Sequence, residues 1–240
     1  MPEHVFSYQV SGTLTMNDGD KLSVFEPGDF RFIKRNTLVK FLKQPPPNGE
    51  FKSASVYLSQ EILRDFSIEF GYKTSGHYNG DGVIKLKPAP LYKSFIDSLL
   101  PYQQEGVYIN QQLQTLKVRE AILLLLQNNP ELTQVLFDFS EPGKIDLEGF
   151  MEKNFHFNVQ LKRFAYLTGR SLATFKRDFQ KLFKTTPSRW LQQRRLQEAR
   201  YLIKEKGKAP SDVYLELGFE DLSHFSFAFK KLYGVGPSRI

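Results

Sequence analysis

The sequence predicts an α+β protein, in which a small β-barrel domain with helices precedes an all-α domain. Residues before 60 fall into many short runs of alternating apolar and polar side chains, the pattern of half-buried strands. Residues after 150 fall into helical repeats separated by short turns, without a strand pattern. The length of 240 residues suits two small domains. We expect domains at residues 1–137 and 151–240, joined by a polar linker at residues 138–150.

Turn signals divide the N-terminal part into short strands. Alternation starts at Phe6, and residues 17–20 and 26–29 are rich in the Asn, Asp, Gly and Pro of turns. Three prolines at residues 45–47 exclude a helix or a central strand there. Many short strands at this spacing favour a small barrel or sandwich. Further strands are expected at residues 30–33, 38–41 and 51–58, and helices at 61–66 (capped by Ser59), 91–103 and 107–128.

A helix-turn-helix motif is predicted at residues 161–183. Ala165 is small enough for two helices to approach closely, Gly169 tolerates the positive φ of the turn, and Ser171 suits the cap of the second helix. The apolar positions that follow Ser171 form a helical stripe. The opposite face is polar and basic, as insertion into a DNA major groove requires. It offers Ala173, Thr174, Lys176, Arg177, Gln180, Lys181 and Lys184.

The same pattern recurs about 50 residues later, around Gly218. Between the two motifs, residues 187–204 are predicted to form one helix about 27 Å long. A rigid helix of this length could hold two recognition helices about one DNA turn, roughly 34 Å, apart.

The charge of the chain is unevenly distributed. Residues 1–150 hold 15 Lys and Arg against 18 Asp and Glu, whereas residues 151–240 hold 18 against 8. This excess of positive charge is expected of a domain that binds a polyanion, although a basic domain without such a partner is the plainer alternative.

Composition and motif content argue against several classes of protein. The chain has no Cys, which excludes disulfides and thiolate metal sites and is compatible with the cytoplasm, where we expect the protein. No apolar run approaches the roughly 18 residues of a membrane span. The histidines His4, His77, His156 and His224 lie far apart, and nucleotide and nucleophile motifs are missing. We therefore expect no metal, no cofactor and no enzymatic activity.

Residues 218–238, GFEDLSHFSFAFKKLYGVGPS, closely resemble the signature of AraC/XylS-type transcription regulators. The resemblance extends over residues 154–239 and implies a seven-helix domain whose two motifs enter successive major grooves of double-stranded DNA. It implies base contacts from Ala173, Thr174, Lys176 and Arg177, and from Leu222, Ser223, His224 and Ser226. Phosphate contacts would come from Lys181, Lys184, Arg189, Lys230 and Lys231, although any one of these lysines is equally well explained as a solvated side chain.

Two positions depart from the family pattern. The family usually has Arg where this chain has Phe227, and a small residue where it has Tyr214. Loss of the Arg removes a bidentate contact to guanine or phosphate. Phe227 could instead touch a thymine methyl group or a protein, of which RNA polymerase is the candidate.

The N-terminal part resembles the cupin-like sensor domains of AraC-type regulators, in the group related to type III secretion activators. Residues 27–29, 34–37 and 45–47 carry this resemblance. It implies a barrel with helices that form a homodimer, and control by a small-molecule or protein effector. The barrel interior could bind an effector or be filled by Phe side chains. The expected dimer contacts are Leu113, Leu116, Lys117, Glu120 and Leu124, on a helix face that could equally be core.

Together these observations predict a sequence-specific, DNA-binding transcription regulator that acts as an activator. Two alternatives stay open. An effector or partner bound to the N-terminal domain could gate DNA binding, or the second motif could mainly contact RNA polymerase or another protein.

Overall fold

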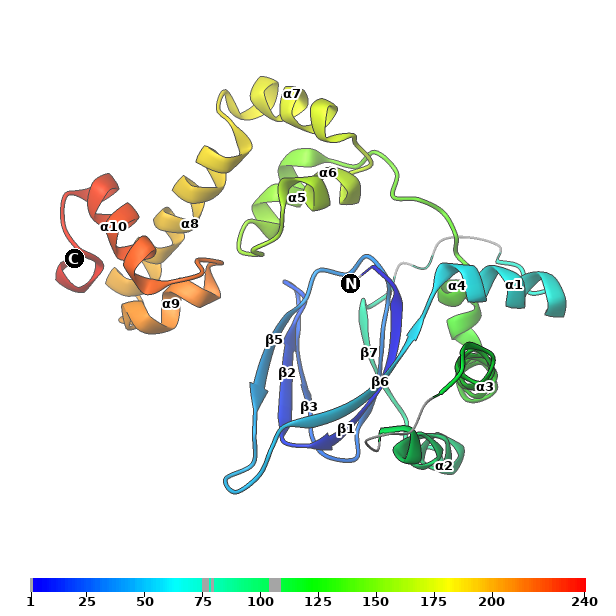
Figure 1. Ribbon diagram of the computed structural model, residues 1–240. Coiled ribbons are helices and arrows are strands. Elements are labelled where there is room, and N and C mark those ends of the chain that lie inside the picture. Colours follow the sequence, from blue (N-terminus) through cyan, green and yellow to red (C-terminus); the bar gives the residue numbers. More distant parts are fainter. Residues whose placement is uncertain (1, 75–77, 79, 104–108) are drawn as a thin grey trace. The chain divides into compact units, whose positions relative to one another are not determined.

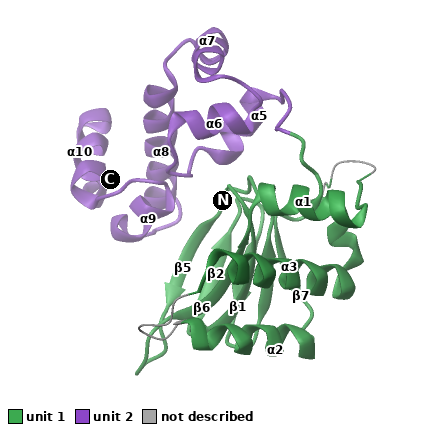
Figure 2. Ribbon diagram, turned by 45° about the vertical axis from the view of Figure 1, so that its right-hand side comes forward, with its two compact units in different colours: residues 1–140 green, residues 141–240 purple. Residues whose placement is uncertain are grey.

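The computed structural model describes residues 2–74, 78, 80–103 and 109–240. The chain forms two compact units, unit 1 at residues 1–140 and unit 2 at residues 141–240 (Figure 2). The boundary falls within the expected linker. Because a helix begins at Leu147, the last residues of that expected linker are helical.

Unit 1 contains two antiparallel sheets and four α-helices in the part that the structure describes (Figure 1). The four-stranded sheet has the order β6-β1-β4-β7, and the three-stranded sheet has the order β3-β2-β5. The strands are β1 (His4–Ser11), β2 (Thr13–Asn17), β3 (Leu22–Phe25), β4 (Phe30–Ile33), β5 (Lys40–Gln44), β6 (Lys52–Leu58) and β7 (Val83–Leu86). The helices are α1 (Gln60–Phe70), α2 (Pro90–Leu99), α3 (Gln111–Asn128) and α4 (Thr133–Leu136).

The expected barrel is not closed, because no ladder joins the two sheets among the described residues. Gly12 explains how the chain passes from one sheet to the other. It has a φ of +75°, and a Cβ atom there would lie 2.5 Å from the carbonyl oxygen of Gln44. This sharp bend separates β1 from β2, so two strands that are adjacent in sequence belong to different sheets.

Side chains of β1 alternate between two cores. Val5 packs with Met16, Phe25 and other residues of both sheets, whereas Phe6 packs with the helices. The second core is larger and rich in aromatic residues, and it joins the four-stranded sheet to α1, α2, α3 and α4 (Figure 1). The space between the sheets therefore contains apolar side chains of the chain itself.

The predicted helices of unit 1 occur with shifted ends. Ser59 caps α1 by accepting a hydrogen bond from the Ile62 amide (3.3 Å), as predicted. The helix expected at residues 91–103 is α2 followed by a 3-10 turn. Of the helix expected at residues 107–128, the first two residues lie outside the described part, and α3 begins at Gln111. No helix in the described part of the chain could cross a membrane.

Unit 2 consists of six α-helices and a terminal 3-10 turn across residues 141–240, all of which are described. The helix predicted at residues 187–204 is observed with those bounds. The elements are α5 (Leu147–Asn154), α6 (Leu161–Leu167), α7 (Leu172–Phe183), α8 (Pro187–Lys204), α9 (Pro210–Glu216), α10 (Leu222–Tyr233) and the turn Pro237–Arg239.

A buried histidine makes the stability of unit 1 depend on pH. The His4 imidazole is buried, and its Nδ1 accepts a hydrogen bond from the Arg35 amide (3.1 Å). Burial, aided by Arg35 and Lys34, lowers the pKa of His4 to about 3. The unfolded chain takes up this proton near pH 6.5, whereas the folded chain does not. Stability therefore falls as the pH is lowered between these two values.

We expect unit 1 to lose about 2 kcal/mol of unfolding free energy from this group between pH 7 and pH 5. Urea unfolding followed by circular dichroism measures the effect, with the fluorescence of the single Trp marking the transition of unit 2. His4→Asn keeps an acceptor but cannot titrate, so its stability should change much less over this range. An equal pH dependence in the variant would contradict the prediction.

Candidate nucleic-acid interface

The first helix-turn-helix motif consists of α6, the turn at residues 168–171 and α7. Ala165 is buried, and its carbonyl oxygen accepts a hydrogen bond from the Arg170 amide (2.9 Å). Gly169 has a φ of +64°, which confirms the predicted need for glycine in the turn. The Ser171 hydroxyl accepts a hydrogen bond from the Thr174 amide (3.2 Å) and so caps α7 as predicted.

The inner side of α7 is anchored by aromatic packing. Phe175 and Phe179 are fully buried, and Phe179 and Phe183 both pack against Trp190 at the start of α8. Because apolar side chains fix this side of the helix, the opposite side must face solvent.

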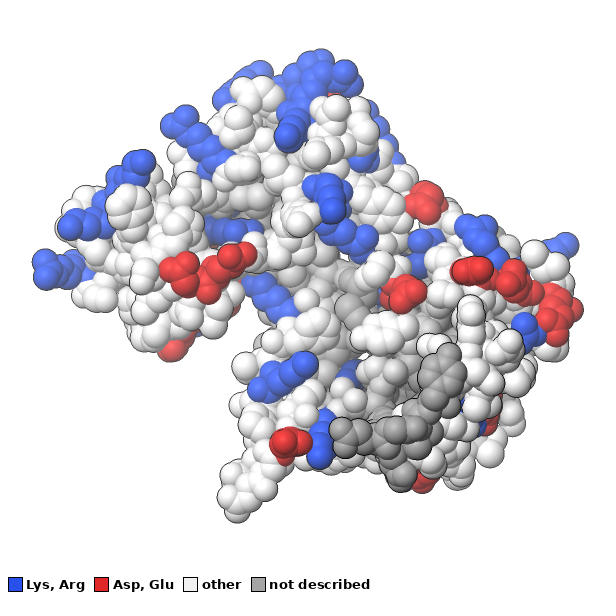
Figure 3. All heavy atoms as spheres, in the orientation of Figure 1, with Lys and Arg blue, Asp and Glu red and all other residues white. Residues whose placement is uncertain are grey.

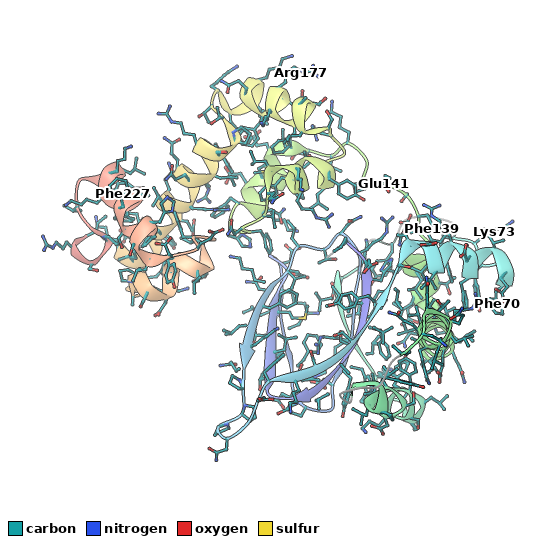
Figure 4. All side chains as sticks on the ribbon, in the orientation of Figure 1. Phe70, Lys73, Phe139, Glu141, Arg177 and Phe227 are labelled. Atoms are coloured by element: carbon teal, nitrogen blue, oxygen red, sulfur yellow. The ribbon has the colours of Figure 1, made fainter. Side chains whose placement is uncertain are left out.

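The outer side of α7 carries most of the predicted DNA contacts. Figure 3 shows Lys and Arg side chains gathered at the top of unit 2, where α7 lies. The side chain of Arg177 is 66% exposed (Figure 4). Thr174 is the exception, because it is half-buried and its hydroxyl hydrogen-bonds to Ser171 (3.0 Å). The other predicted residues, Ala173, Lys176, Lys181 and Lys184 of this motif and Arg189 of α8, are exposed.

An ion pair keeps the one acidic residue of α7 from opposing this basic surface. Asp178 accepts a hydrogen bond from Nε of Arg170 (3.2 Å), which holds the pKa of the carboxyl below its usual value. The same guanidinium donates to the carbonyl oxygens of Ile145 (3.0 Å) and Thr168 (2.7 Å). The sequence analysis missed Arg170, whose position directly after the turn glycine was the available signal.

The second motif consists of α9, its turn and α10. Gly218 has a φ of +83°, and Asp221 caps α10 by accepting a hydrogen bond from the His224 amide (2.6 Å). Phe227 is 69% exposed and lies on the outer surface of α10 (Figure 4). Ser226 is half-buried, so its predicted base contact has less support than the others. The remaining predicted residues, Leu222, Ser223, His224, Lys230 and Lys231, are exposed.

The second helices of the two motifs, α7 and α10, differ in charge at their N-termini. The N-cap of α7 is the neutral Ser171, whereas Glu220 and the capping carboxylate of Asp221 directly precede α10. Acidic groups stabilise a helix N-terminus but repel DNA phosphates. A phosphate group would therefore be repelled less at the N-terminus of α7 than at that of α10.

The expected dimer residues do not share one exposed face of α3. Lys117 donates hydrogen bonds to Ser98 (2.9 Å) and Glu120 (2.9 Å) of the same chain, and Leu124 packs against the core. Leu113 is half-buried. Leu116 is 61% exposed. Leu123, which is not among the expected dimer residues, is also exposed, at 46%. Part of the expected stripe on α3 faces the core. The sequence pattern does not distinguish these inward-facing residues from exposed ones.

Leu116 and Leu123 lie in an open groove of about 900 Å³ between α3 and the end of α1. Phe70 of α1 contributes a third exposed apolar side chain (Figure 4). Across the described residues of the chain, no cluster of His, Asp or Glu side chains could hold a metal ion. His77 lies outside these residues.

Comparison with protein families finds two matches that together cover most of the chain. The family described as the ExsA N-terminal regulatory domain matches residues 4–135. The family described as a helix-turn-helix domain matches residues 164–240.

Individual proteins resemble the chain to different extents. The HTH-type transcriptional regulator ExsA of Pseudomonas aeruginosa is 27% identical over 239 residues, which is 96% of this chain and 83% of ExsA. The virulence regulon transcriptional activator VirF of Yersinia enterocolitica is 30% identical over 50% of this chain, but the match spans less than half of VirF, 45%. A crystal structure of apo ToxT from Vibrio cholerae aligns over 100% of this chain and 88% of its own, with 10% identity and a TM-score of 0.46.

Proposed function

The chain belongs to the family of AraC-type transcription regulators that carry an ExsA N-terminal regulatory domain, and we propose that it activates transcription by reading two adjacent major grooves of DNA. In this proposal α7 and α10 are the recognition helices, and unit 1 regulates DNA binding or mediates dimerisation. The resemblance predicted from residues 218–238 is confirmed at the level of the family. DNA binding follows from that membership.

The observation that carries the proposal is the exposed basic side of α7. Arg177 projects from a helix whose opposite side is fixed by buried Phe175 and Phe179. The helix follows a tight turn with a left-handed glycine, as a recognition helix does. An arginine on such a helix can donate two hydrogen bonds to the major-groove edge of guanine. We assign base reading first to Arg177 and Lys176, with Lys181, Lys184 and Arg189 on phosphates.

Selection of binding sites from a pool of random DNA duplexes tests this proposal. The expected result is an enriched motif with two blocks about ten base pairs apart, one for each recognition helix. A single enriched block would contradict reading by α10. If the full chain enriches nothing but residues 141–240 alone do, then unit 1 gates DNA binding. Enrichment by neither would overturn the proposal.

A second role for α10 is favoured by the exposure of Phe227. A phenylalanine that is 69% exposed on a basic helix suits an apolar pocket of a protein, and we propose RNA polymerase as that partner. Phe227→Arg separates the two roles. If Phe227 contacts the polymerase, the variant should keep its affinity for DNA within about twofold and lose most transcription activation in a purified system.

Phe227→Leu is the matched control, because it keeps an apolar side chain at the same position and should retain most of the activation. Stronger DNA binding by Phe227→Arg would instead indicate that α10 lies in the groove and lacks a base contact.

We propose that the groove on α3 is where a second copy of the chain docks. Leu116 and Leu123 are seven residues apart and so lie on one side of the helix, next to Phe70. Leu123→Glu places a charge in this groove and should convert a dimer to a monomer in sedimentation experiments at high micromolar concentration. Ile68→Glu is the control, because Ile68 is also apolar and is more exposed than Leu123 (80% against 46%) but does not line the groove. A monomeric unmodified chain would contradict dimerisation through this surface.

A further inference from the structure

One guanidinium connects the two helix-turn-helix motifs of unit 2. Arg195, in the middle of α8, donates from Nε to the carbonyl oxygen of Phe155 (2.8 Å) and from Nη2 to that of Phe157 (3.0 Å). Both carbonyls belong to the segment that leads into the first motif. Its Nη1 donates to the carbonyl oxygen of Gly218 (2.9 Å), in the turn of the second motif.

The turn of the second motif also packs directly against that segment. A Cβ atom at Gly218 would lie 2.6 Å from the carbonyl oxygen of His156 and 3.2 Å from Cζ of Arg195. The backbone of the turn therefore approaches the other backbone as closely as glycine allows. An exposed hydrogen bond from Asn158 to Glu220 (3.0 Å) makes a second connection between the same two regions.

A short loop joins α8 to the second motif. α8 ends at Lys204, and the loop before α9 contains Gly207, which has a φ of +66° and no atom within 4 Å of a Cβ built there. The amides of Gly207 and Lys208 donate to the carbonyl oxygens of Ile203 (3.2 Å) and Leu202 (3.1 Å), so the start of the loop is tied to the last turn of α8. These bonds do not reach the segment before the first motif, and a contact outside the loop is needed to hold the second motif against that segment. Because the Arg195 guanidinium bonds to both sides, it is placed to supply that constraint.

The bonds of Arg195 persist at physiological pH. Burial lowers the pKa of its guanidinium to about 10, which still leaves the group charged near neutrality. Charge-assisted hydrogen bonds are stronger than neutral ones, and the planar guanidinium matches three carbonyl oxygens at once. Lysine has a single ammonium group and cannot reproduce this geometry.

We infer that Arg195 is a positioning residue, which sets the separation of α7 and α10 and thereby the half-site spacing that the protein accepts on DNA. The inference rests on the proposed reading of DNA by both motifs. Adjacent base pairs are separated by about 3.4 Å along the helix axis, so a displacement of α10 by a few ångströms corresponds to one base pair.

The first test measures how tightly the full chain binds DNA that carries either one block or both blocks of the selected motif. In the two-block DNA, the spacer either has its selected length or is changed by one base pair. Arg195→Lys should bind the two-block site about tenfold more weakly and should discriminate less between spacers. Its affinity for one block should stay within about twofold. Arg194→Met is the control, because Arg194 pairs with Glu152 (2.9 Å) and Glu198 (3.0 Å) and so does not contact the second motif.

The second test measures the separation of the helices without DNA. The chain has no Cys, so Gln180→Cys on α7 and Lys231→Cys on α10 accept two spin labels specifically, both at exposed positions. The distance distribution between the labels should broaden in Arg195→Lys and stay narrow in Arg194→Met.

Several outcomes would overturn the inference. An unchanged distance distribution in Arg195→Lys would do so. So would equal losses of affinity by this variant for one-block and two-block DNA. If the unmodified protein selects one block but the distances still depend on Arg195, the proposed reading by α10 fails while the structural constraint stands. If the unmodified protein selects two blocks and Arg195→Lys prefers the same spacer length as strongly, the inference about Arg195 fails while the proposed reading of DNA by both motifs stands.

Discussion

Arg177→Ala is expected to weaken binding to the selected DNA site by about 1–3 kcal/mol, which is about 5-fold to 150-fold in affinity. The reason is the loss of a bidentate hydrogen bond to one base, since the side chain is exposed and projects from α7. The variant should also accept any base at one position of its site. A competition assay with single-base variants of the site measures both effects.

Two further variants separate base reading from general attraction to DNA. Arg177→Lys keeps the charge but not the planar pair of donors, so it should lose most of the selectivity and less of the affinity. Lys206→Ala removes one exposed positive charge outside the predicted interface and should change affinity little. If Arg177→Ala weakens binding equally to all sequences, Arg177 contacts a phosphate and the assignment of base reading is wrong.

Gly169→Ala is expected to destabilise unit 2 by about 2–4 kcal/mol, for two separate reasons. First, Gly169 has a φ of +64°, a conformation that costs other residues about 1 kcal/mol or more. Second, a Cβ atom there would lie 2.3 Å from the carbonyl carbon of Gly143 and 2.5 Å from the Lys144 amide nitrogen. Because both neighbours are backbone atoms, the chain before α5 must move away from the turn.

Gly207→Ala measures the first reason alone, so the difference between the two variants isolates the second. Gly207 has nearly the same φ, +66°, but nothing lies within 4 Å of a Cβ atom built there. It should therefore cost only the conformational part, about 1 kcal/mol. The single Trp, Trp190, packs against Phe179 and Phe183 and reports the urea unfolding of unit 2 by fluorescence. Equal losses in the two variants would contradict close packing of residues 143–144 on the turn.

The close packing at Gly169 also connects the first residues of unit 2 to its first helix-turn-helix motif. The residues directly after unit 1 contact the first motif through the Gly143 backbone and through a hydrogen bond from the Tyr166 hydroxyl to Glu141 (2.6 Å; Glu141 is labelled in Figure 4). Gly169→Ala should therefore loosen this connection as well as destabilise unit 2.

The sequence by itself determined that unit 2 is helical and where α8 and the helices of the two motifs lie, whereas α5 was not recognised because its first residues fall in the expected linker. The signals are local: in each motif the left-handed glycine (Gly169 or Gly218), the cap and the apolar stripe lie within about 23 residues of one another. The predicted bounds of α8 agree with the structure, in which Thr186 caps the helix and Pro187 is its first residue. A family signature in the same region then determined the class of protein.

Only the tertiary structure decided the features that depend on distant parts of the chain. β7 has four residues, too few for an alternating pattern, and is a strand because it pairs with β4 some 50 residues earlier. The N-terminal strands form two sheets rather than a barrel because Gly12 bends the chain between them. Leu124 faces inward while Leu123 faces outward because α3 packs on a core formed by other elements. Arg195 acquires its three partners 23 to 40 residues away in the sequence, and no local pattern specifies contacts of that range.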